Sequence, residues 1–170
     1  MLEAARRRLG GDRLTTPPGG ATSGGLAPAA SAMAPAARAA QMLHGDVRAV
    51  PLADGACDAV LACAVLHHLP GGESQRALAD FARVLVPGGR LLASCWDPCA
   101  KAVGKRGRRI GESCAYWVPW RCADGQDADR WYHLPSMSER QELWASLPGL
   151  ALQRTELDGD NQVFEWTRTS

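Results

Sequence analysis

This sequence has no run of about 20 consecutive apolar residues, so it is not a protein that crosses a membrane by a helix. It also has little net charge: the formal value is +1 at pH 7, which gives the whole molecule no strong attraction to nucleic acid or to a membrane surface. No secretory signal precedes its cysteines. The 170 residues, 46% of them hydrophobic and 22% charged, therefore suit one modest globular domain, expected in the cytoplasm with the nucleus as an alternative.

The 6 cysteines contain no C-x-x-C pair, and we interpret them as reduced, buried core residues. A zinc site is the alternative, and its ligands would be Cys95, Cys99, Cys114 and Cys122. This spacing is looser than that of the usual zinc patterns, so the sequence predicts no metal site.

Residues 1–41 differ in composition from the rest of the chain. Ten of the twenty residues from Ala21 to Ala40 are alanine, interleaved with Gly, Ser and Pro. Such a segment buries too little apolar surface to offset the entropy of ordering, so we predict a low-complexity, disordered leader. Three arginines, Arg6 to Arg8, leave an organelle transit peptide as an alternative. The folded domain is predicted to span residues 42–170.

The middle of the chain has the pattern of two strands joined by a helix. Cys57–Val65 is a nearly unbroken apolar run, which is typical of a central parallel strand buried on both faces. A helix is predicted over Glu73–Val86, because apolar residues recur there on one face. Pro87-Gly88-Gly89 predicts a turn, and Leu91–Trp96 a second buried strand. This order indicates a βαβ unit and the α/β class.

The flanking segments predict less regular structure. Met42–Asp46 has the pattern of a short strand that stops at a Gly-Asp loop, and Lys101–Arg109 that of a basic loop. Ser138 is the predicted N-cap of a helix that runs to about Leu147. Leu150–Glu156 and Val163–Thr167 predict a closing antiparallel hairpin.

Four features in order carry a resemblance to a known family. They are Gly45-Asp46-x4-Pro51-Leu52, Cys57-Asp58-Ala59-Val60, His67-His68 and Arg83-Val84-Leu85-x-Pro87-Gly88-Gly89. In this order and spacing, the chain resembles the second half of class I S-adenosylmethionine-dependent methyltransferases of the type 11 group. The resemblance implies a Rossmann-like sheet. The first strands and the Gly-rich loop of such domains have no counterpart here, so we expect a truncated sheet in which the first apolar strand has an open edge.

The second half of the chain narrows the resemblance. Val118-Pro119-Trp120, Arg130-Trp131-Tyr132-His133 and Asp160-Asn161 resemble the wobble-uridine tRNA methyltransferases, which are the methyltransferase half of AlkB-homologue-eight proteins and their stand-alone fungal relatives. This resemblance implies transfer of a methyl group from S-adenosylmethionine to the carboxylate of 5-carboxymethyluridine in a tRNA anticodon. It also implies tRNA and a small zinc-binding activator protein as partners.

The resemblance assigns three groups of site residues. The residues expected to bind the cofactor are Asp46, Val47, Ala64, Val65 and His67. The residues expected to have catalytic roles are His67, Arg130, Tyr132 and His133. The residues expected to bind RNA are Lys105, Arg106, Arg108, Arg109, Trp120, Arg121 and Trp131.

The chemistry of the implied reaction agrees with these residue types. A carboxylate is already ionised at neutral pH, so it needs no general base, and its alignment with the methyl group would supply most of the rate. Arginine suits a carboxylate because it can pair with both oxygens. Tryptophan can stack on an extruded base, and lysine and arginine attract phosphates.

Each assignment has a structural alternative. Asp46 can be only a turn residue, and His67 and His68 can be a strand-end cap. The aromatic stretch 116–120 can be core or an activator interface, and the basic run 101–109 can be a solvated loop. At the level of function, the alternatives are a small-molecule methyltransferase of the same fold and a non-catalytic protein that binds a partner through the open strand edge.

Overall fold

The computed structural model describes residues 40–170, of which residues 41–170 form one unit. In chain order its elements are β1 (Cys57–Cys63), the 3-10 helix η1 (Leu66–His68), α2 (Glu73–Val84), β2 (Leu85–Trp96), α3 (Lys101–Arg106), β3 (Arg108–Arg109), β4 (Ala115–Arg121), β5 (Asp127–His133), α4 (Met137–Trp144), β6 (Leu150–Asp158) and β7 (Asn161–Arg168). Within this part of the chain, no helix is long and apolar enough to cross a membrane. The predicted leader, residues 1–41, lies almost wholly outside the described residues and stays a prediction.

The predicted βαβ unit is confirmed. Strands β1 and β2 are parallel, and α2 connects them. The helix buries Leu78 and Phe81 against the sheet and turns its charged residues outward. The helix ends at Val84 rather than at the predicted Val86. Strand β2 begins at Leu85, so Pro87-Gly88-Gly89 is not a separate turn but an irregular start of the strand, where the register with β1 shifts and Gly88 has a φ of +79°.

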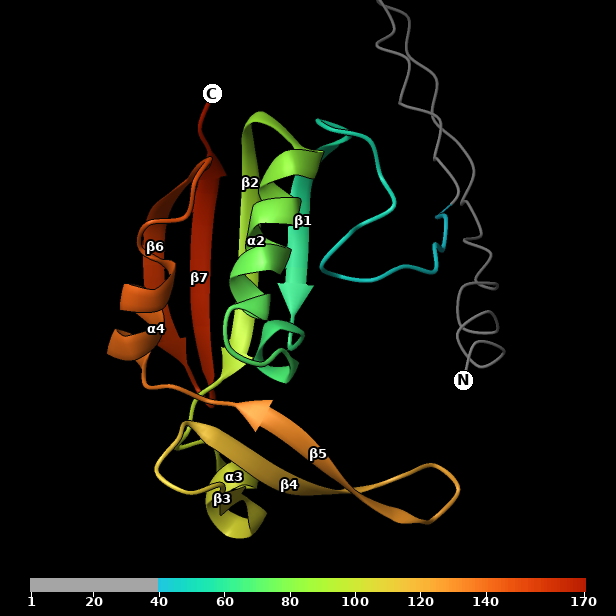
Figure 1. The fold of residues 1–170 in the computed structure, drawn as a ribbon, viewed down its shortest axis with the longest axis vertical. Helices are drawn as coiled ribbons and strands as arrows, with labels where there is room; N and C mark the ends of the chain where they lie inside the picture. The colour runs from blue at the N-terminus through green and yellow to red at the C-terminus, as the bar shows by residue number, and fades with distance from the viewer. Residues whose placement is uncertain (1–39) are drawn as a thin grey trace, which may run out of the picture. The chain divides into compact units, whose positions relative to one another are not determined.

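The main sheet has four strands in the order β1-β2-β7-β6. The predicted C-terminal hairpin is β6 and β7, and β7 pairs antiparallel with β2. Figure 1 shows α2 and α4 in front of the same face of this sheet. One hydrophobic cluster fills the layer between helices and sheet, and it includes Leu78 of α2, Trp144 of α4, and Phe164 and Trp166 of β7. The predicted α/β fold class with a Rossmann-like sheet is thus confirmed.

Strand β1 lies at an edge of the sheet, and among its residues only Ala62 is buried. The prediction that this apolar run is buried on both faces is therefore wrong. Among residues 40–170, β2 is the one strand that pairs with β1. An apolar run indicates a parallel strand, but it does not show how many neighbours the strand has.

A second, antiparallel sheet has the order β3-β4-β5. Figure 1 shows it below the four-stranded sheet. The loop predicted over Lys101–Arg109 is instead α3 and β3, because Val103 of α3 is buried and Arg108 and Arg109 pair with Trp117 and Tyr116 of β4. The cluster under this sheet consists of Ala100, Val103, Val118, Tyr132 and Leu134, with Trp96 and Tyr116 packed against it.

The strand predicted over Met42–Asp46 does not form. Met42 and Leu43 are 79% and 61% exposed, so no packing holds this backbone extended among the described residues. The first turn among the described residues comes directly after this segment, where Asp46 and Ala49 form an isolated antiparallel β-bridge.

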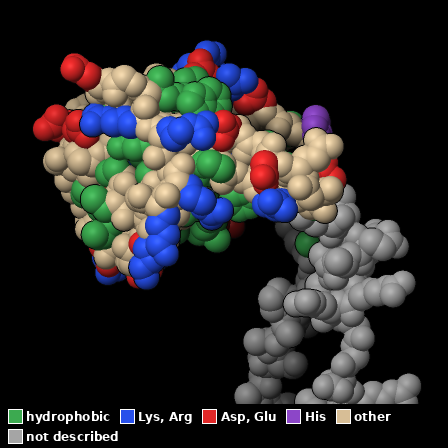
Figure 2. Space-filling view, turned by 90° about the horizontal axis from the view of Figure 1, so that it is seen from below, with side chains coloured by type: hydrophobic (Ala, Val, Ile, Leu, Met, Phe, Trp, Pro, Cys, Tyr) green, Lys and Arg blue, Asp and Glu red, His purple; other side chains and the backbone are tan. Residues whose placement is uncertain are grey.

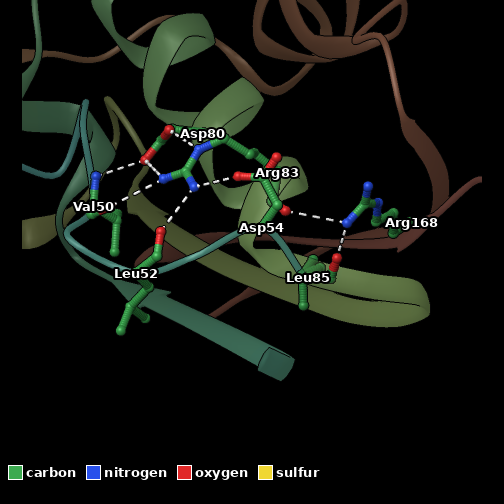
Figure 3. Close-up of polar contacts among 7 residues, drawn as sticks. All are labelled: Val50, Leu52, Asp54, Asp80, Arg83, Leu85 and Arg168. Carbon is green, nitrogen blue, oxygen red and sulfur yellow. Dashed lines mark hydrogen bonds and ion pairs between the residues drawn. The ribbon is translucent and has the colours of Figure 1, made fainter. Parts of the chain in front are cut away.

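The segment after this turn is fastened to α2 by Arg83 (Figure 3). Its guanidinium donates hydrogen bonds to the carbonyl oxygens of Val50 (3.0 Å) and Leu52 (2.8 Å) and to carboxylate oxygens of Asp54 (2.7 Å) and Asp80 (2.7 Å). Asp80 also accepts from the backbone N–H of Val50 at 2.6 Å. Arg83, which belongs to the motif that carried the resemblance, therefore has a structural role.

Helix α4 begins after Ser136, so the predicted N-cap at Ser138 is wrong by two residues. The Ser136 hydroxyl accepts from the backbone N–H of Glu139 at 3.4 Å, and the Glu139 carboxylate accepts from the N–H of Ser136 at 2.7 Å. This reciprocal pair is a capping box.

All six cysteines are free thiols, and only one of them is buried. Cys95 lies in the core, but Cys63 and Cys99 are exposed, so the prediction of buried cysteines holds for Cys95 alone. Residues 40–170 contain no group of His, Cys, Asp or Glu side chains that could hold a metal ion.

Candidate functional site

The candidate site begins where β1 ends. Ala64 has a φ of +56°, an uncommon conformation for a residue with a side chain, and its N–H donates to the carbonyl oxygen of Ser94 at 2.9 Å. The chain then turns through Val65 into η1. Strained backbone of this kind often occurs at functional sites, because surrounding structure must hold it in place.

His67 is the most buried polar side chain of this turn, with 1% of its surface exposed. Its Nδ1 accepts a hydrogen bond from the backbone N–H of Trp96 at 2.9 Å. Burial, together with the positive charges of the neighbouring His68 and Arg140, lowers the pKa of His67 to about 3. The imidazole is therefore neutral at pH 7 with its proton on Nε2. This geometry agrees with the strand-end cap, since His67 satisfies the last N–H of β2.

An aromatic cluster joins the end of β1 to β5 of the second sheet. Trp96 and Tyr132 stack with ring centroids 5.1 Å apart and an interplanar angle of 4°. The ring of Tyr132 also lies 5.1 Å from His67 and 4.4 Å from His68. His68 Nδ1 donates to the carbonyl oxygen of Trp131 at 3.3 Å. The structure thus brings His67, a predicted cofactor-binding residue, next to Tyr132, which is predicted to have a catalytic role.

The buried position of Tyr132 limits what it can do. Only 2% of its surface is exposed, so its ring holds the two sheets together rather than presenting a surface to a large substrate. His133 is half-buried and stacks on Trp131 at 6.2 Å. Burial lowers the pKa of His133, and the positive charge of Arg140 acts in the same direction.

A buried polar network under this cluster was not predicted. Arg140 of α4 is 1% exposed; it donates through Nε to Oε1 of Gln162 at 2.7 Å and through a terminal nitrogen to the carbonyl oxygen of His133 at 3.3 Å. Gln162 in turn donates to Asp97 (2.8 Å) and to the carbonyl oxygen of Pro135 (3.1 Å). Burial lowers the pKa of Arg140. The sequence offers no signal for this network, because charged residues on a short helix are usually exposed.

The hairpin of β4 and β5 carries the exposed aromatic residues. Trp117 and Trp120 are 40% and 39% exposed, which is unusual for such large apolar side chains. The guanidinium of Arg130 lies over the Trp120 ring, 4.0 Å from its centroid, a cation–π contact. Figure 2, which views the molecule from below, shows Lys and Arg side chains interspersed with hydrophobic ones on this side.

Three of the predicted RNA-binding arginines already have partners within the described residues. Arg108 pairs with Asp129, and Arg121 pairs with Asp127 at 2.7 Å. Arg109 donates to backbone carbonyl oxygens of its own loop. Among residues 40–170, Arg130 has no ion pair, so its positive charge is less compensated than that of Arg108 or Arg121.

Asp46 and Val47 lie in the turn before β1 rather than at the end of a strand. Arg48 holds the Asp46 carboxylate at 2.6 Å and lowers its pKa to about 2. Arg48 also reaches Glu73, at the start of α2, at 2.9 Å. These contacts agree with the alternative in which Asp46 is a turn residue.

The described residues fit an S-adenosylmethionine site only in part. Ala64 and Val65 lie at the carboxyl end of β1, where ligands of open α/β sheets bind, but the His67 side chain beside them is buried. Asp46, the predicted adenine partner, is already paired with Arg48. A hollow of about 260 Å³ lies instead on the open face of the sheet, beside Leu61 and Leu92. No reaction step through the cofactor follows from these residues.

Sequence comparison relates the chain to methyltransferases. Residues 21–93 match the family model described as a methyltransferase domain. A protein named "Putative methyltransferase" from Encephalitozoon cuniculi is 37% identical over 104 residues, which are 60% of this chain and 49% of that protein. The tRNA (carboxymethyluridine(34)-5-O)-methyltransferase of Mus musculus is 43% identical over 78 residues, 42% of this chain and 12% of that protein. The chain spans half or less of the length of these relatives.

Structure comparison agrees with the fold. An S-adenosylmethionine-dependent methyltransferase from Methanosarcina mazei has a TM-score of 0.56 at 14% identity, over 74% of this chain and 65% of that one. A chain of the complex between the Haloferax volcanii Trm112 methyltransferase activator and a methyltransferase has a TM-score of 0.51 at 12% identity, over 75% and 60%. At these identities the likeness shows the fold alone.

Proposed function

We propose that this chain, which its fold and partial sequence matches relate to the class I S-adenosylmethionine-dependent methyltransferases, methylates the carboxylate of 5-carboxymethyluridine at the wobble position of tRNA. The residues at the end of β1 face the cofactor in this proposal, and the hairpin of β4 and β5 faces the RNA. The name of the Mus musculus relative supports this substrate.

One observation carries the proposal: the end of β1 and strand β5 meet. The hydrogen bond from His68 to Trp131 and the packing of His67 on Tyr132 join them directly. A methyltransferase needs its cofactor and its acceptor within bonding distance, so the two walls of its site must adjoin. His67 and Tyr132 act in this arrangement as positioning residues that hold the walls together.

The acceptor carboxylate needs a cationic partner that is not already neutralised. Arg130 meets this condition, because its guanidinium rests on Trp120 rather than on a carboxylate. Its fork of N–H groups can pair with both oxygens of a carboxylate. Trp120 beside it offers a ring on which an extruded base can stack. Lys105 and Arg106 of α3 would add attraction to phosphates.

A small zinc-binding activator is the proposed protein partner. Support comes from the Haloferax volcanii relative of the fold, which is part of a complex with the Trm112 activator. The exposed Trp117 of β4 is the residue that we expect such a partner to cover.

The proposal predicts selective binding of the modified anticodon. A fluorescent anticodon stem-loop with 5-carboxymethyluridine should bind the full chain more tightly than one with uridine, and binding should weaken as salt rises. Arg130→Ala should weaken binding of the modified loop by roughly ten- to a hundredfold, because a charge-assisted pair contributes about 1.5–3 kcal/mol. Fluorescence anisotropy measures both affinities.

Arg154→Ala is the matched control, since Arg154 is also an exposed arginine but lies on β6 and pairs with Glu156. It should leave the affinity unchanged. Equal affinity for the two stem-loops, or an equal loss in the two variants, would contradict the proposed substrate.

A further inference from the structure

The second sheet is inserted into the chain between β2 and α4, and two short connections join it to the main sheet. The first connection, residues 97–100, leads from β2 to α3, and the second connection, residues 134–136, leads from β5 to α4. Figure 1 shows both connections beside the start of β7. Residues at the ends of elements are the usual hinges between parts of a protein, so the contacts of these connections determine how the second sheet is placed.

The turn before β7 and the start of that strand hold the first connection. The backbone N–H of Asp97 donates to the carbonyl oxygen of Asp160 at 2.9 Å, and the N–H of Lys101 donates to Oδ2 of Asp160 at 3.2 Å. Gln162 donates through Nε2 to Oδ2 of Asp97 at 2.8 Å. Asp160, one of the residues that carried the resemblance, therefore fixes the backbone between β2 and α3.

The same glutamine holds the second connection. Its Nε2 also donates to the carbonyl oxygen of Pro135 at 3.1 Å. Its Oε1 accepts from Nε of Arg140 at 2.7 Å, and Arg140 donates to the carbonyl oxygen of His133 at 3.3 Å. Because a guanidinium only donates, the Gln162 oxygen faces Arg140, and the amide nitrogen faces one acceptor from each connection.

Burial makes this arrangement specific. Gln162 is 0% exposed and Arg140 is 1% exposed, so water does not compete for their hydrogen bonds. Among residues 40–170 Arg140 has no direct ion pair, because the amide of Gln162 separates it from Asp97. A buried charge contributes little to stability compared with a well-packed apolar side chain, whereas a fully satisfied polar network favours one arrangement of the elements that it joins.

We propose that Arg140 and Gln162 are positioning residues for the methyl transfer: by holding both connections, they fix Arg130 on β5 relative to the end of β1. This inference rests on the proposed function, in which Arg130 binds the acceptor carboxylate and the cofactor lies at the end of β1. Both positioning residues are buried and touch neither reactant. They matter for turnover because a displacement of about 1 Å, caused far from the chemistry, can cost about 100-fold in rate.

Residual dipolar couplings of the backbone amides measure whether the two sheets keep one relative orientation. In the wild-type full chain, a single alignment tensor should fit the couplings of both sheets. In Gln162→Leu the second sheet should need a separate tensor of smaller magnitude, because that side chain no longer bonds to either connection. Gln141→Leu is the matched control: Gln141 bonds α4 to Thr155 of β6, and this bond involves neither connection, so one tensor should still fit.

Gln162→Glu is the second variant, in case the leucine variant does not fold. Its carboxylate still accepts from Arg140, so the buried guanidinium keeps a partner, but it cannot donate to Asp97 or Pro135. The two sheets should therefore need separate tensors in this variant as well. One tensor for both sheets in the folded glutamate variant, or separate tensors in the wild type, would overturn the proposal.

Kinetics distinguish positioning from a general loss of structure. Arg130 and Trp120 both belong to the second sheet and move together, so Gln162→Glu should bind the modified anticodon stem-loop as the wild type does. Its kcat for methyl transfer should fall about tenfold or more, since the acceptor is then misaligned. An unchanged kcat, or a loss of affinity as large as the loss of kcat, would overturn the positioning role. A wild-type chain that transfers no methyl group would overturn the proposed function and with it this role, whereas the dipolar couplings would still decide whether Arg140 and Gln162 hold the two sheets.

Discussion

His67 shows how one side chain can serve the fold and still lie at the site. Its Nδ1 satisfies the terminal N–H of β2, and its ring packs on Tyr132. Because the folded protein keeps this imidazole neutral down to about pH 3, folding excludes a proton that the unfolded chain binds below its ordinary pKa of 6.5.

This difference predicts that the free energy of unfolding decreases as the pH falls. The contribution of His67 is complete above pH 6.5 and decreases as the pH falls toward 3, so between pH 7 and pH 5 it costs about 2 kcal/mol of the free energy of unfolding. His67→Asn keeps an acceptor near the N–H of Trp96 but cannot be protonated. Urea denaturation at both pH values should therefore show a smaller loss in this variant, and an equal loss would contradict the neutral imidazole.

The second residue of interest is Gln162, which is 0% exposed and links Arg140 to Asp97. Gln162→Leu keeps the volume but leaves a buried guanidinium without its acceptor, so it should lower the free energy of unfolding by about 2–4 kcal/mol. Gln153→Leu, at an exposed position on β6, is the control and should change it by less than about 0.5 kcal/mol. Urea denaturation measures both; a small effect of Gln162→Leu would mean that water replaces the amide.

At the scale of elements, α4 depends on its N-terminal cap. Its eight residues are too few to be stable alone, so the capping box of Ser136 and Glu139 is needed to fix its start. Ser136→Ala should cost about 1 kcal/mol of stability, measured by thermal or urea unfolding. Ser138→Ala should cost less, since Ser138 lies inside the helix; the reverse order would favour the cap predicted from sequence.

The elements that sequence predicted best are those whose own residues specify their pattern. The amphipathic face of α2 and the closing hairpin are local features, and both are found. Of the turn predicted at Pro87-Gly88-Gly89, only the positive φ of Gly88 is found, because these residues lie inside β2. The strand at Met42–Asp46 failed because an extended backbone needs a neighbour to bond with, and a sequence window does not show whether one exists.

The second sheet illustrates the same limit. Its strands are short and aromatic, and α3 buries only Val103, so neither a strand nor a helix period stands out. The site residues predicted between Arg130 and His133 lie on one strand, β5, and their roles stay predictions; the resemblance did not indicate Arg140 or Gln162. Those two act through contacts between distant segments, and residue type alone favours an exposed position for both.

At the scale of the whole molecule, aromatic and polar contacts couple the two sheets. Trp96 at the end of β2 stacks on Tyr132 of β5, and η1 bonds to the backbone of the same strand. The proposed RNA-facing hairpin is thereby fixed relative to the strand ends at which ligands of such sheets bind. In the proposed function, this coupling holds the substrate side, on the second sheet, next to the cofactor side at the end of β1.

The most direct test of this account is methyl transfer from S-adenosylmethionine, labelled in the methyl group, to tRNA that carries 5-carboxymethyluridine. The reaction should be run with the full chain, alone and with a Trm112-type activator. We predict label in the modified tRNA that mild alkali releases, as it does from a methyl ester, and none in tRNA with unmodified uridine. Label that resists alkali, or no label in a folded sample with or without the activator, would contradict the account.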